Sequence, residues 1–449
     1  MYENIIGQDE VCRTLATAIR CESLPPALLF SGPPASGKLT TALETARLLS
    51  CREAGAWNCP CPDCAMHRRL GHPDLLLFGP RSLPEEIGVA KEFLLRTPCQ
   101  ASAYFFLRAL GKLVARFNPA LWTSEESKLG KAAALVESIN EAADRIDPAK
   151  IGLRLDPEIL KAAESAHSDA LALELLVPES PVFMLRNMRI WAQLAPTGRR
   201  RTVIIENADR MQDSARNAML KILEEPPDTV RFILLTSRRA SMLATVLSRA
   251  RLYSFSPRDE KTSALILQRV LKTDERAESL KAFYESRLPF SPAQARSRAE
   301  KLVGRILVDA GWERERLAAY GQSLFDLAVE EALDSAGILD EVSQQTKGFG
   351  SRDKAMAGSF IRFLRALTVV FSDLLQESSG NKLLLTLIDR CSALIRDAAI
   401  QQGSYNRNPE FLARLLVVSF AEQAENLQNS DTGSLSPGDR DSQREGGRP

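Results

Sequence analysis

The sequence predicts an α/β fold in which a parallel sheet carries a phosphate-binding loop and is followed by an all-helical C-terminal part. Three observations lead to this prediction. The runs 27–30, 202–205 and 232–235 are almost entirely apolar, which is typical of strands buried on both faces of a parallel sheet. The first run leads directly into a glycine-rich segment with a lysine. Beyond residue 257, apolar residues recur at helical spacing and no further strand pattern is found.

Length and charge narrow the class of protein. A chain of 449 residues is long enough for about three domains. The 58 Lys and Arg residues nearly cancel the 57 Asp and Glu residues, which argues against a surface that binds nucleic acid everywhere but not against a local patch. The sequence has no pattern of a signal peptide or of a membrane span, so we expect a cytoplasmic protein without membrane contact.

The segment 32–40 has the context that a phosphate-binding loop needs. It reads Gly-Pro-Pro-Ala-Ser-Gly-Lys-Leu-Thr between an apolar run and a helical pattern. Backbone N–H groups of such a loop face an anion at the helix N-terminus. We therefore predict nucleotide-binding roles for Gly32, Ser36, Gly37 and Lys38, and for Thr40 on the helix that follows. The competing interpretation, a glycine-rich turn that only reverses the chain, is disfavoured by the flanking strand and helix.

The loop departs from its usual pattern at one position. A Ser or Thr normally follows the lysine and ligates magnesium through its hydroxyl, but this chain has Leu39 there. Thr40 comes one residue later, about 100° further around the helix. The loop can still cradle ATP, with Thr40 nearby, but its hold on magnesium should be poor.

Four cysteines between residues 51 and 64 predict a structural zinc site. Cys51, Cys59, Cys61 and Cys64 supply four thiolates, enough to close a tetrahedral zinc site. The spacing between Cys59 and Cys61 is one residue tighter than in most zinc knuckles, so His67 remains an alternative to Cys59 as the fourth ligand. A chance cluster of free cysteines is the competing interpretation.

A helical insertion is expected from about residue 80 to 180. Three stretches in it have helical periodicity, and prolines separate them. It contains no pattern typical of a catalytic site. Its histidine, His167, lies among alanines and acidic residues, and we expect it to be exposed.

The stretch 202–249 reads as strand, helix and strand. Functional residues in parallel sheets lie where the strands end. Glu206 and Asn207 follow the first strand, and Thr236 ends the second. We therefore place Glu206 and Thr236 among the nucleotide-binding candidates. Ser248 and Arg249 close the stretch.

Together these motifs resemble the bacterial DNA polymerase III clamp-loader subunits, which are AAA+ proteins, and in particular the delta-prime type. The resemblance covers roughly residues 1–80 and 180–256 with specific motifs, and the C-terminal helices only by general pattern. The insertion is not expected in that family. The motifs are Ile6-Gly-Gln8, the phosphate loop, the cysteine cluster, His72-Pro-Asp74, Ile205-Glu-Asn-Ala-Asp209, the segment Asn217-Ala-x-Leu-Lys221-x-Leu-Glu-Glu-Pro226-Pro, and Leu247-Ser-Arg249.

The resemblance implies a loss of hydrolysis. Members that hydrolyse ATP have Asp-Glu at the end of the strand, where the Asp holds magnesium and the Glu orients the attacking water. This chain has Glu206-Asn207, and an amide cannot act as that base. Combined with Leu39, this implies that ATP is bound without hydrolysis, or hydrolysed very weakly.

The same resemblance gives Arg249 a role at a neighbouring subunit. A Ser-Arg-Cys motif in the family lends an arginine finger to the ATP of the next subunit, and such an arginine stabilises charge on the phosphoryl group. This chain matches at Ser248 and Arg249 but has Ala250 in the third position. A surface arginine without that role is the competing interpretation.

The resemblance also implies an organisation and partners. We expect an AAA+ domain at 1–256 with the zinc module at about 51–64, a helical lid at 257–312, an all-α collar at 313–428 that assembles a hetero-oligomeric ring, and a disordered tail at 429–449. The implied partners are the gamma/tau and delta subunits, with the sliding clamp and primed DNA contacted through the complex.

Three functions follow from this reading. The first is a delta-prime-like stator within the DNA polymerase III holoenzyme that has no catalysis of its own. The second is an ATP-hydrolysing subunit of the gamma/tau type, against which Leu39 and Asn207 count. The third is a zinc-dependent interaction protein outside replication.

Overall fold

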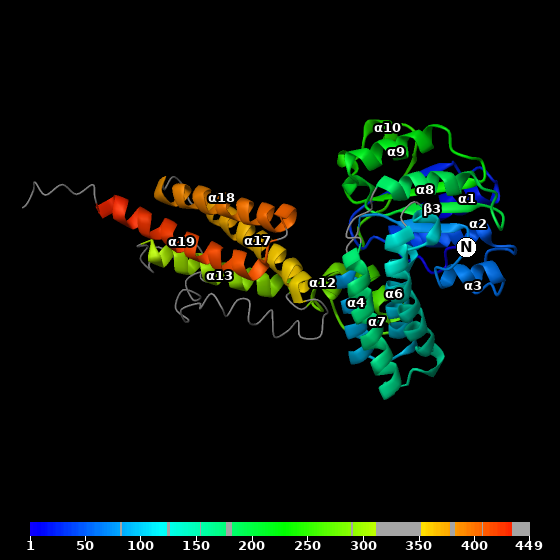
Figure 1. Cartoon of the computed structure of the whole chain (residues 1–449), viewed down its shortest axis with the longest axis horizontal. Helices are drawn as coiled ribbons and strands as arrows, with labels where there is room; N and C mark the ends of the chain where they lie inside the picture. Colours follow the sequence, from blue (N-terminus) through cyan, green and yellow to red (C-terminus); the bar gives the residue numbers. More distant parts are fainter. Residues whose placement is uncertain are drawn as a thin grey trace, which may run out of the picture. The chain divides into compact units, whose positions relative to one another are not determined.

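A computed structural model describes the chain as two compact units, divided between Arg287 and Leu288 (Figure 1). The described residues are 1–80, 83–123, 126–152, 154–176, 182–288, 291–310, 352–377, 382–405 and 407–432.

A five-stranded parallel sheet forms the centre of the first unit, in the order β2-β3-β4-β1-β5. The parallel sheet predicted from the apolar runs is thus confirmed. Because all strands are parallel, their C-terminal ends lie at one edge. The strands are β1 (Ala27–Ser31), β2 (Leu75–Phe78), β3 (Arg201–Ile205), β4 (Val230–Thr236) and β5 (Arg251–Ser254).

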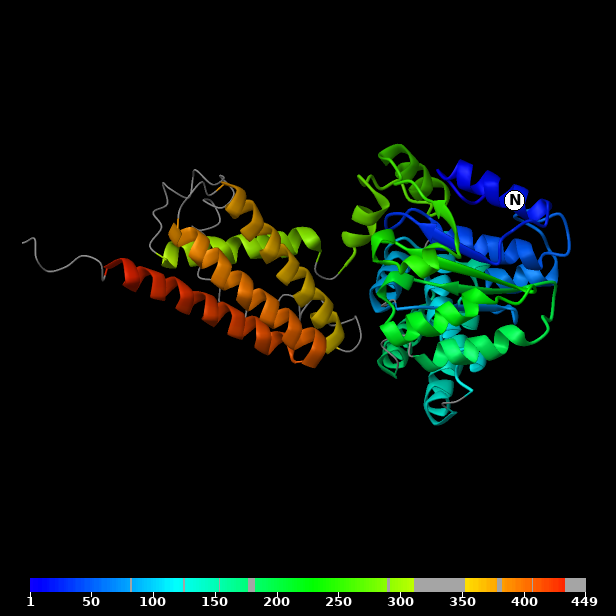
Figure 2. The same cartoon turned by 90° about the horizontal axis from the view of Figure 1, so that it is seen from above.

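Helices cover both faces of this sheet, because alternate strand residues point to opposite sides. In β1, Leu28 and Phe30 pack toward α1 (Asp9–Arg20) and α2 (Lys38–Ser50). Leu29 belongs to the other core. The helices packed on that second face include α8 (Val182–Gln193), α9 (Asp213–Glu224) and the short α10 (Ala244–Leu247), with the sheet between the two layers in Figure 2.

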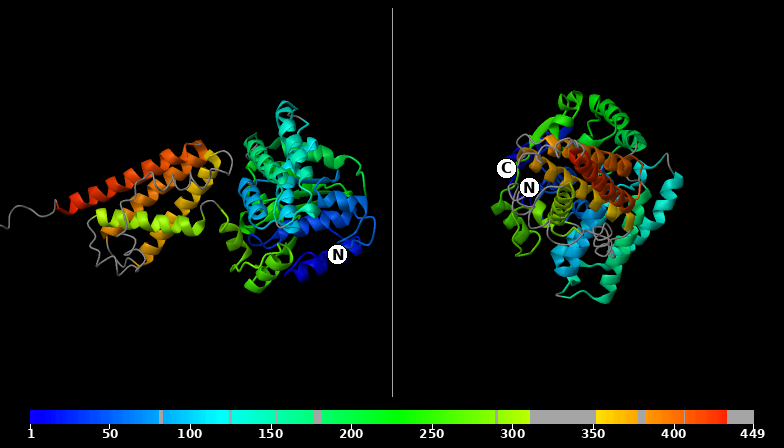
Figure 3. Two further views of the ribbon diagram at one scale, coloured as in Figure 1. Left: turned by 90° about the horizontal axis from the view of Figure 1, so that it is seen from below. Right: turned by 90° about the vertical axis from the view of Figure 1, so that its left-hand side faces the viewer.

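The expected insertion is helical, and its helices are drawn in light blue and cyan in Figure 3. Its apolar faces join the core of the sheet's second face, with Trp122 fully buried. The prediction that His167 is exposed is wrong: only 2% of it is accessible. His167 lies on the helix Pro157–Leu176, which packs closely against the helix Glu126–Arg145. Small side chains such as Ala166 on the first of these helices allow close approach to the surrounding core. The elements are α4 (Pro84–Arg96), α5 (Gln100–Ala115), η1 (Pro119–Leu121), α6 (Glu126–Arg145), η2 (Pro148–Lys150) and α7 (Pro157–Leu176).

Two short helices after the sheet, α11 (Glu260–Arg269) and α12 (Leu280–Glu285), belong to the first unit. Leu267 and Phe283 form a small core with Phe93 of α4. The boundary between the units falls within the stretch 257–312, where we expected a helical lid, and the three-domain division stays a prediction.

The described helices of the second unit run side by side in Figures 2 and 3 and share one core. Phe371 of α17 and Phe420 of α19 meet edge to face at its centre. No described helix is long and apolar enough to cross a membrane. The expected tail lies, from residue 433 onward, outside the described residues. The helices are α13 (Pro292–Asp309), α17 (Arg352–Glu377), α18 (Lys382–Tyr405) and α19 (Pro409–Thr432).

Candidate functional site

The glycine-rich loop 32–37 lies at the C-terminal edge of the sheet, where β1 ends. Ser31 is in register with Thr236 of β4. The N–H of Gly32 donates to the Thr236 carbonyl oxygen at 3.3 Å, and the N–H of Phe255 donates to the Ser31 carbonyl oxygen at 2.7 Å. The loop therefore starts from a fixed position between the ends of β4 and β5.

The loop ends at Gly37, which precedes the first residue of α2 and has a φ of 96°. This left-handed conformation favours glycine. Gln8 holds the preceding residue, because its Nε2 donates to the Ser36 carbonyl oxygen at 3.2 Å and to the Ser256 carbonyl oxygen at 2.8 Å. The motif Ile6-Gly-Gln8 thus fixes the loop to the chain that follows β5.

Lys38 lies across its own loop. Its Nζ donates to the carbonyl oxygens of Gly32 and Pro33, each at 2.6 Å, and to Ser36 Oγ at 3.3 Å. Burial lowers the pKa of Lys38 to about 8, although Asp209 acts in the opposite direction. The ammonium group is therefore partly desolvated and bonded only to neutral oxygens.

The parts that would hold magnesium are incomplete. Leu39 is half-buried and packs against the core under α1, while Thr40 is exposed. Asn207 adopts a left-handed conformation with φ 48°, and its Nδ2 donates to the Pro80 carbonyl oxygen at 3.1 Å. Its amide is thus used to hold the chain after β2. Glu206 is buried at the same edge.

Thr236 contacts a carboxylate that the sequence interpretation did not include among the site residues. Its Oγ1 donates to Asp209 Oδ1 at 2.8 Å, and Arg238 Nε donates to Asp209 Oδ2 at 3.2 Å. Asp209 is buried. The position of Asp209 in the motif after β3 could have indicated a role at the site. Only the fold shows that Asp209 lies beside the end of β4.

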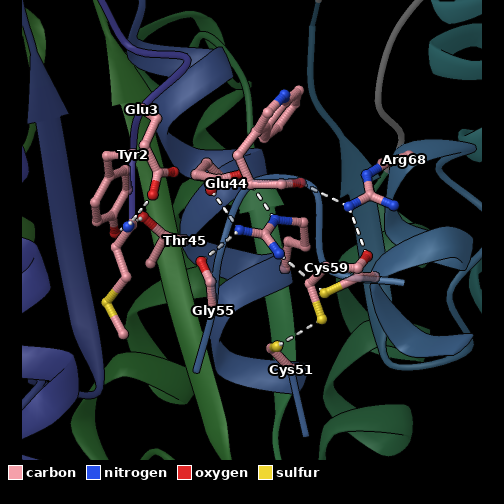
Figure 4. Close-up of polar contacts among 12 residues, drawn as sticks. Tyr2, Glu3, Glu44, Thr45, Cys51, Gly55, Cys59 and Arg68 are labelled. Carbon is pink, nitrogen blue, oxygen red and sulfur yellow. Dashed lines mark hydrogen bonds and ion pairs between the residues drawn. The ribbon is translucent and has the colours of Figure 1, made fainter. Parts of the chain in front are cut away.

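The four cysteines are all buried and form a compact cluster next to the C-terminal end of α2. Their sulfur atoms lie within 4.8 Å of one another, and those of Cys51 and Cys59 are 3.7 Å apart (Figure 4). A tetrahedral zinc ion with Zn–S bonds of about 2.3 Å has edges of about 3.8 Å between its sulfurs. The cluster therefore fits zinc, and these four residues would hold it.

Charged side chains surround the cluster and fix its shape. Arg47 of α2 donates through Nη1 to Cys64 Sγ at 2.9 Å, through Nη2 to Glu44 Oε1 at 2.6 Å, and through Nη2 to the Gly55 carbonyl oxygen at 3.0 Å. Arg68 of α3 (Pro62–Arg68) donates to the Cys59 carbonyl oxygen at 2.7 Å (Figure 4). Burial raises the pKa of the Cys64 thiol, and the Arg47 guanidinium opposes that rise. The arginine therefore supports the thiolate that a metal needs.

His67 lies outside the sulfur cluster. Its Nε2 is 2.9 Å from Ser50 Oγ, and its ring stacks on His72 with the centroids 4.2 Å apart. His72 Nε2 lies 3.2 Å from Asp63 Oδ1. Among the described residues, the side chains close enough together to hold one metal ion include Cys59 but not His67. This favours four cysteines as the ligands.

Arg249 lies on the surface, two residues beyond the end of α10. Its guanidinium is exposed, with Nη1 donating to the Thr245 carbonyl oxygen at 3.0 Å and Nη2 at 3.4 Å from Glu224 Oε1. These are weak surface contacts. The structure thus brings the loop residues, Glu206 and Thr236 to one edge of the sheet, and leaves Arg249 on the surface.

A parallel sheet with a glycine-rich loop and lysine after its first strand defines a P-loop domain. Residues 7–104 and 160–259 match the family model described as DNA polymerase III, delta subunit. The gap between these two segments lies inside the expected insertion. The first unit therefore contains a P-loop domain, and the matched residues are similar to the DNA polymerase III clamp-loader subunits.

Known relatives are similar over short stretches. The delta' subunit of DNA polymerase III from Haemophilus influenzae is 37% identical over 70 residues, which are 16% of this chain and 21% of the relative. The Escherichia coli K12 delta' subunit is 39% identical over 75 residues, or 17% and 22%. The gamma/tau subunit from Mycobacterium tuberculosis H37Rv is 33% identical over 90 residues, or 20% and 16%. The matched stretches thus cover about a fifth of these relatives.

A solved structure, titled as a DNA polymerase III gamma subunit-related protein from Thermotoga maritima, is 19% identical. The structural match covers 54% of this chain and 79% of the Thermotoga maritima chain, with a TM-score of 0.26.

Proposed function

We propose that this chain is a delta-prime-like clamp-loader subunit, a non-hydrolysing AAA+ stator that supplies Arg249 to the ATP of a neighbouring gamma/tau-type subunit. In this role it helps a hetero-oligomeric ring, completed by a delta subunit, to open the sliding clamp and load it on primed DNA. The C-terminal helices form the collar of that ring.

The state of the magnesium-holding positions carries this proposal. Leu39 has no hydroxyl and packs against the core, and the Asn207 amide donates to the Pro80 carbonyl oxygen. Hydrolysis in P-loop proteins needs both a well-held metal and a positioned water. Metal binding and the positioning of the attacking water are therefore both deficient, in a domain whose fold is otherwise intact.

The position of Arg249 supports the second half of the proposal. An arginine that serves another subunit must be accessible and must not be bound in a strong ion pair. Arg249 is exposed, and its contact with the Glu224 carboxylate is long, at 3.4 Å. A phosphoryl group on a neighbouring subunit can compete with such a contact.

Reconstitution with gamma/tau and delta subunits tests the finger role. An arginine finger is worth about a thousandfold or more in kcat at the site it serves. Arg249→Ala should therefore leave assembly intact and nearly abolish turnover at that one site, which lowers the total ATPase rate of the complex. Arg239→Ala, an exposed arginine of η4 (Arg239–Ser241), is the matched control. An unchanged rate for Arg249→Ala would remove the finger role.

A steady-state ATPase assay on the isolated chain tests the stator role. We expect no magnesium-dependent turnover above background. The alternative, an ATP-hydrolysing subunit of the gamma/tau type, predicts turnover that disappears in Lys38→Ala. A failure to co-purify with clamp-loader subunits would instead favour a zinc-dependent interaction protein.

A further inference from the structure

Arg258, which the sequence interpretation did not single out, reaches back from the segment after β5 to the phosphate loop. Its Nη1 donates to the Ala35 carbonyl oxygen at 3.0 Å. Its Nη2 lies 2.6 Å from the place that a Cβ on Gly37 would occupy. The guanidinium is thus packed against the loop just before α2 begins.

The charge of Arg258 has no counter-charge among the described residues. Its bonded oxygen is a neutral carbonyl, and its buried Nε has no hydrogen-bond partner. Lys38, on the same loop, also donates only to neutral oxygens. Holding a partly buried cation without a counter-charge costs free energy. The Asp209 carboxylate acts on Lys38 without a hydrogen bond to it, so a polyphosphate at this loop would stabilise both cations.

The carboxylate of Asp209, at this edge of the sheet, is placed in a way that does not favour a magnesium ion. Both carboxylate oxygens of Asp209 accept hydrogen bonds, from Thr236 and Arg238. The position after Lys38 offers no oxygen, and Asn207 offers an amide that already donates to the chain after β2. The negative charge of a bound nucleotide must therefore be balanced mainly by side-chain cations.

We infer that the loop 32–37 binds the polyphosphate of a nucleoside diphosphate or triphosphate without a divalent cation, with Arg258 and Lys38 supplying the positive charge that a metal ion would otherwise supply. This inference rests on the proposed function, because a subunit that does not hydrolyse its nucleotide has no need of a catalytic metal. The nucleotide then acts as a structural part of the first unit.

Calorimetric titration of the full chain with ADP and with ATP tests this inference, once in excess EDTA and once in excess magnesium chloride. The wild-type Kd should agree within about twofold between the two conditions. Arg258→Ala should raise the Kd in EDTA about tenfold or more. Arg269→Ala removes an exposed arginine at the end of α11 and should leave the Kd unchanged.

Arg258→Lys is a second variant that controls for a folding defect in Arg258→Ala. It keeps the positive charge but lacks the planar guanidinium. Its Kd should fall between those of the wild type and Arg258→Ala, with an unchanged thermal melt. Nucleotide binding that requires magnesium would overturn the inference. Equal or tighter nucleotide binding by Arg258→Ala would also overturn it, because the arginine would then block the loop instead of binding the nucleotide. No binding of either nucleotide would also overturn it, while leaving the stator role to be judged by reconstitution.

Magnesium-dependent ATP turnover by the wild type would sink the proposed function instead. In that case, loss of ADP binding by Arg258→Ala in EDTA would still support a direct role of the arginine at the loop.

Discussion

The two ends of helix α2 hold two sites that differ in how completely they are built. At the C-terminal end, four cysteines are enclosed and Arg47, bonded to Cys64 and Glu44, has its charge balanced. At the N-terminal end, the phosphate loop keeps its glycines and Lys38, but Leu39 and Asn207 replace the oxygens that hold a metal and orient water.

The difference follows from what each site must do. A structural metal site needs only its ligands, their burial and the charges that orient them, and all of these lie within about twenty-five residues along the chain. A hydrolytic site needs groups from several strand ends at once, so two changes far apart in sequence would be enough to remove its function without damaging the fold. Tyr2, bonded through its hydroxyl to Thr45 at 2.8 Å, fixes the middle of the helix that joins the two (Figure 4).

The largest effect is expected from breaking the cysteine cluster. Cys61→Ser with Cys64→Ser should remove about one zinc per chain, and the first unit should lose several kcal/mol of stability, because structural zinc contributes directly to folding. Metal analysis and thermal unfolding measure both. Cys21→Ser, at an exposed cysteine, is the control. His67→Ala should keep the metal, and a wild-type chain that is stable and metal-free would remove the site.

A smaller but still large effect is expected from the charge that supports the cluster. Arg47→Met leaves the Glu44 carboxylate, 3% exposed, without its partner. Breaking a buried ion pair in this way costs about 3–5 kcal/mol, which urea unfolding measures. Glu44→Gln combined with Arg47→Met should recover part of the loss. A change below about 1 kcal/mol would contradict the view that this end of α2 depends on the pair.

The phosphate-loop end should respond to pH through Lys38. Burial holds the pKa of Lys38 near 8 in the free protein, and a bound polyphosphate must raise that pKa because it favours the charged form. Nucleotide binding should therefore be independent of this group below about pH 7 and should weaken above about pH 8, by at most about tenfold per pH unit. Titration at pH 9 in two buffers of different ionisation enthalpy should detect proton uptake. Proton release would contradict this linkage.

The smallest effect is expected from restoring the missing oxygens. Leu39→Thr with Asn207→Glu supplies the hydroxyl and the carboxylate, at a cost of about 1–2 kcal/mol from lost packing and from a glutamate in a left-handed conformation. Magnesium should then tighten ATP binding by about threefold or more, equal to about 0.7 kcal/mol. The double variant is compared with the wild type with and without the metal. An equal magnesium effect in both proteins would mean that other groups hold the ion.

Most of the sheet could be predicted from the sequence, because strands buried on both faces must be apolar throughout. The runs at 27–30, 202–205 and 232–235 fall within β1, β3 and β4 with ends that differ by at most two residues. The exposure of His167 could not be predicted, since the small residues around it suit either a solvent-facing helix or a close helix contact. Only the packing of α7 against its neighbours α4, α5 and α6 decided that it is buried.

The sequence by itself determined the chemistry of the two sites, since a missing hydroxyl at Leu39, an amide at Asn207 and four clustered cysteines are facts of composition and spacing. The tertiary structure alone decided which distant groups meet there. Arg258 and Asp209 follow different strands, and they come to the ends of β1 and β4 only because parallel strands place their C-terminal ends at one edge.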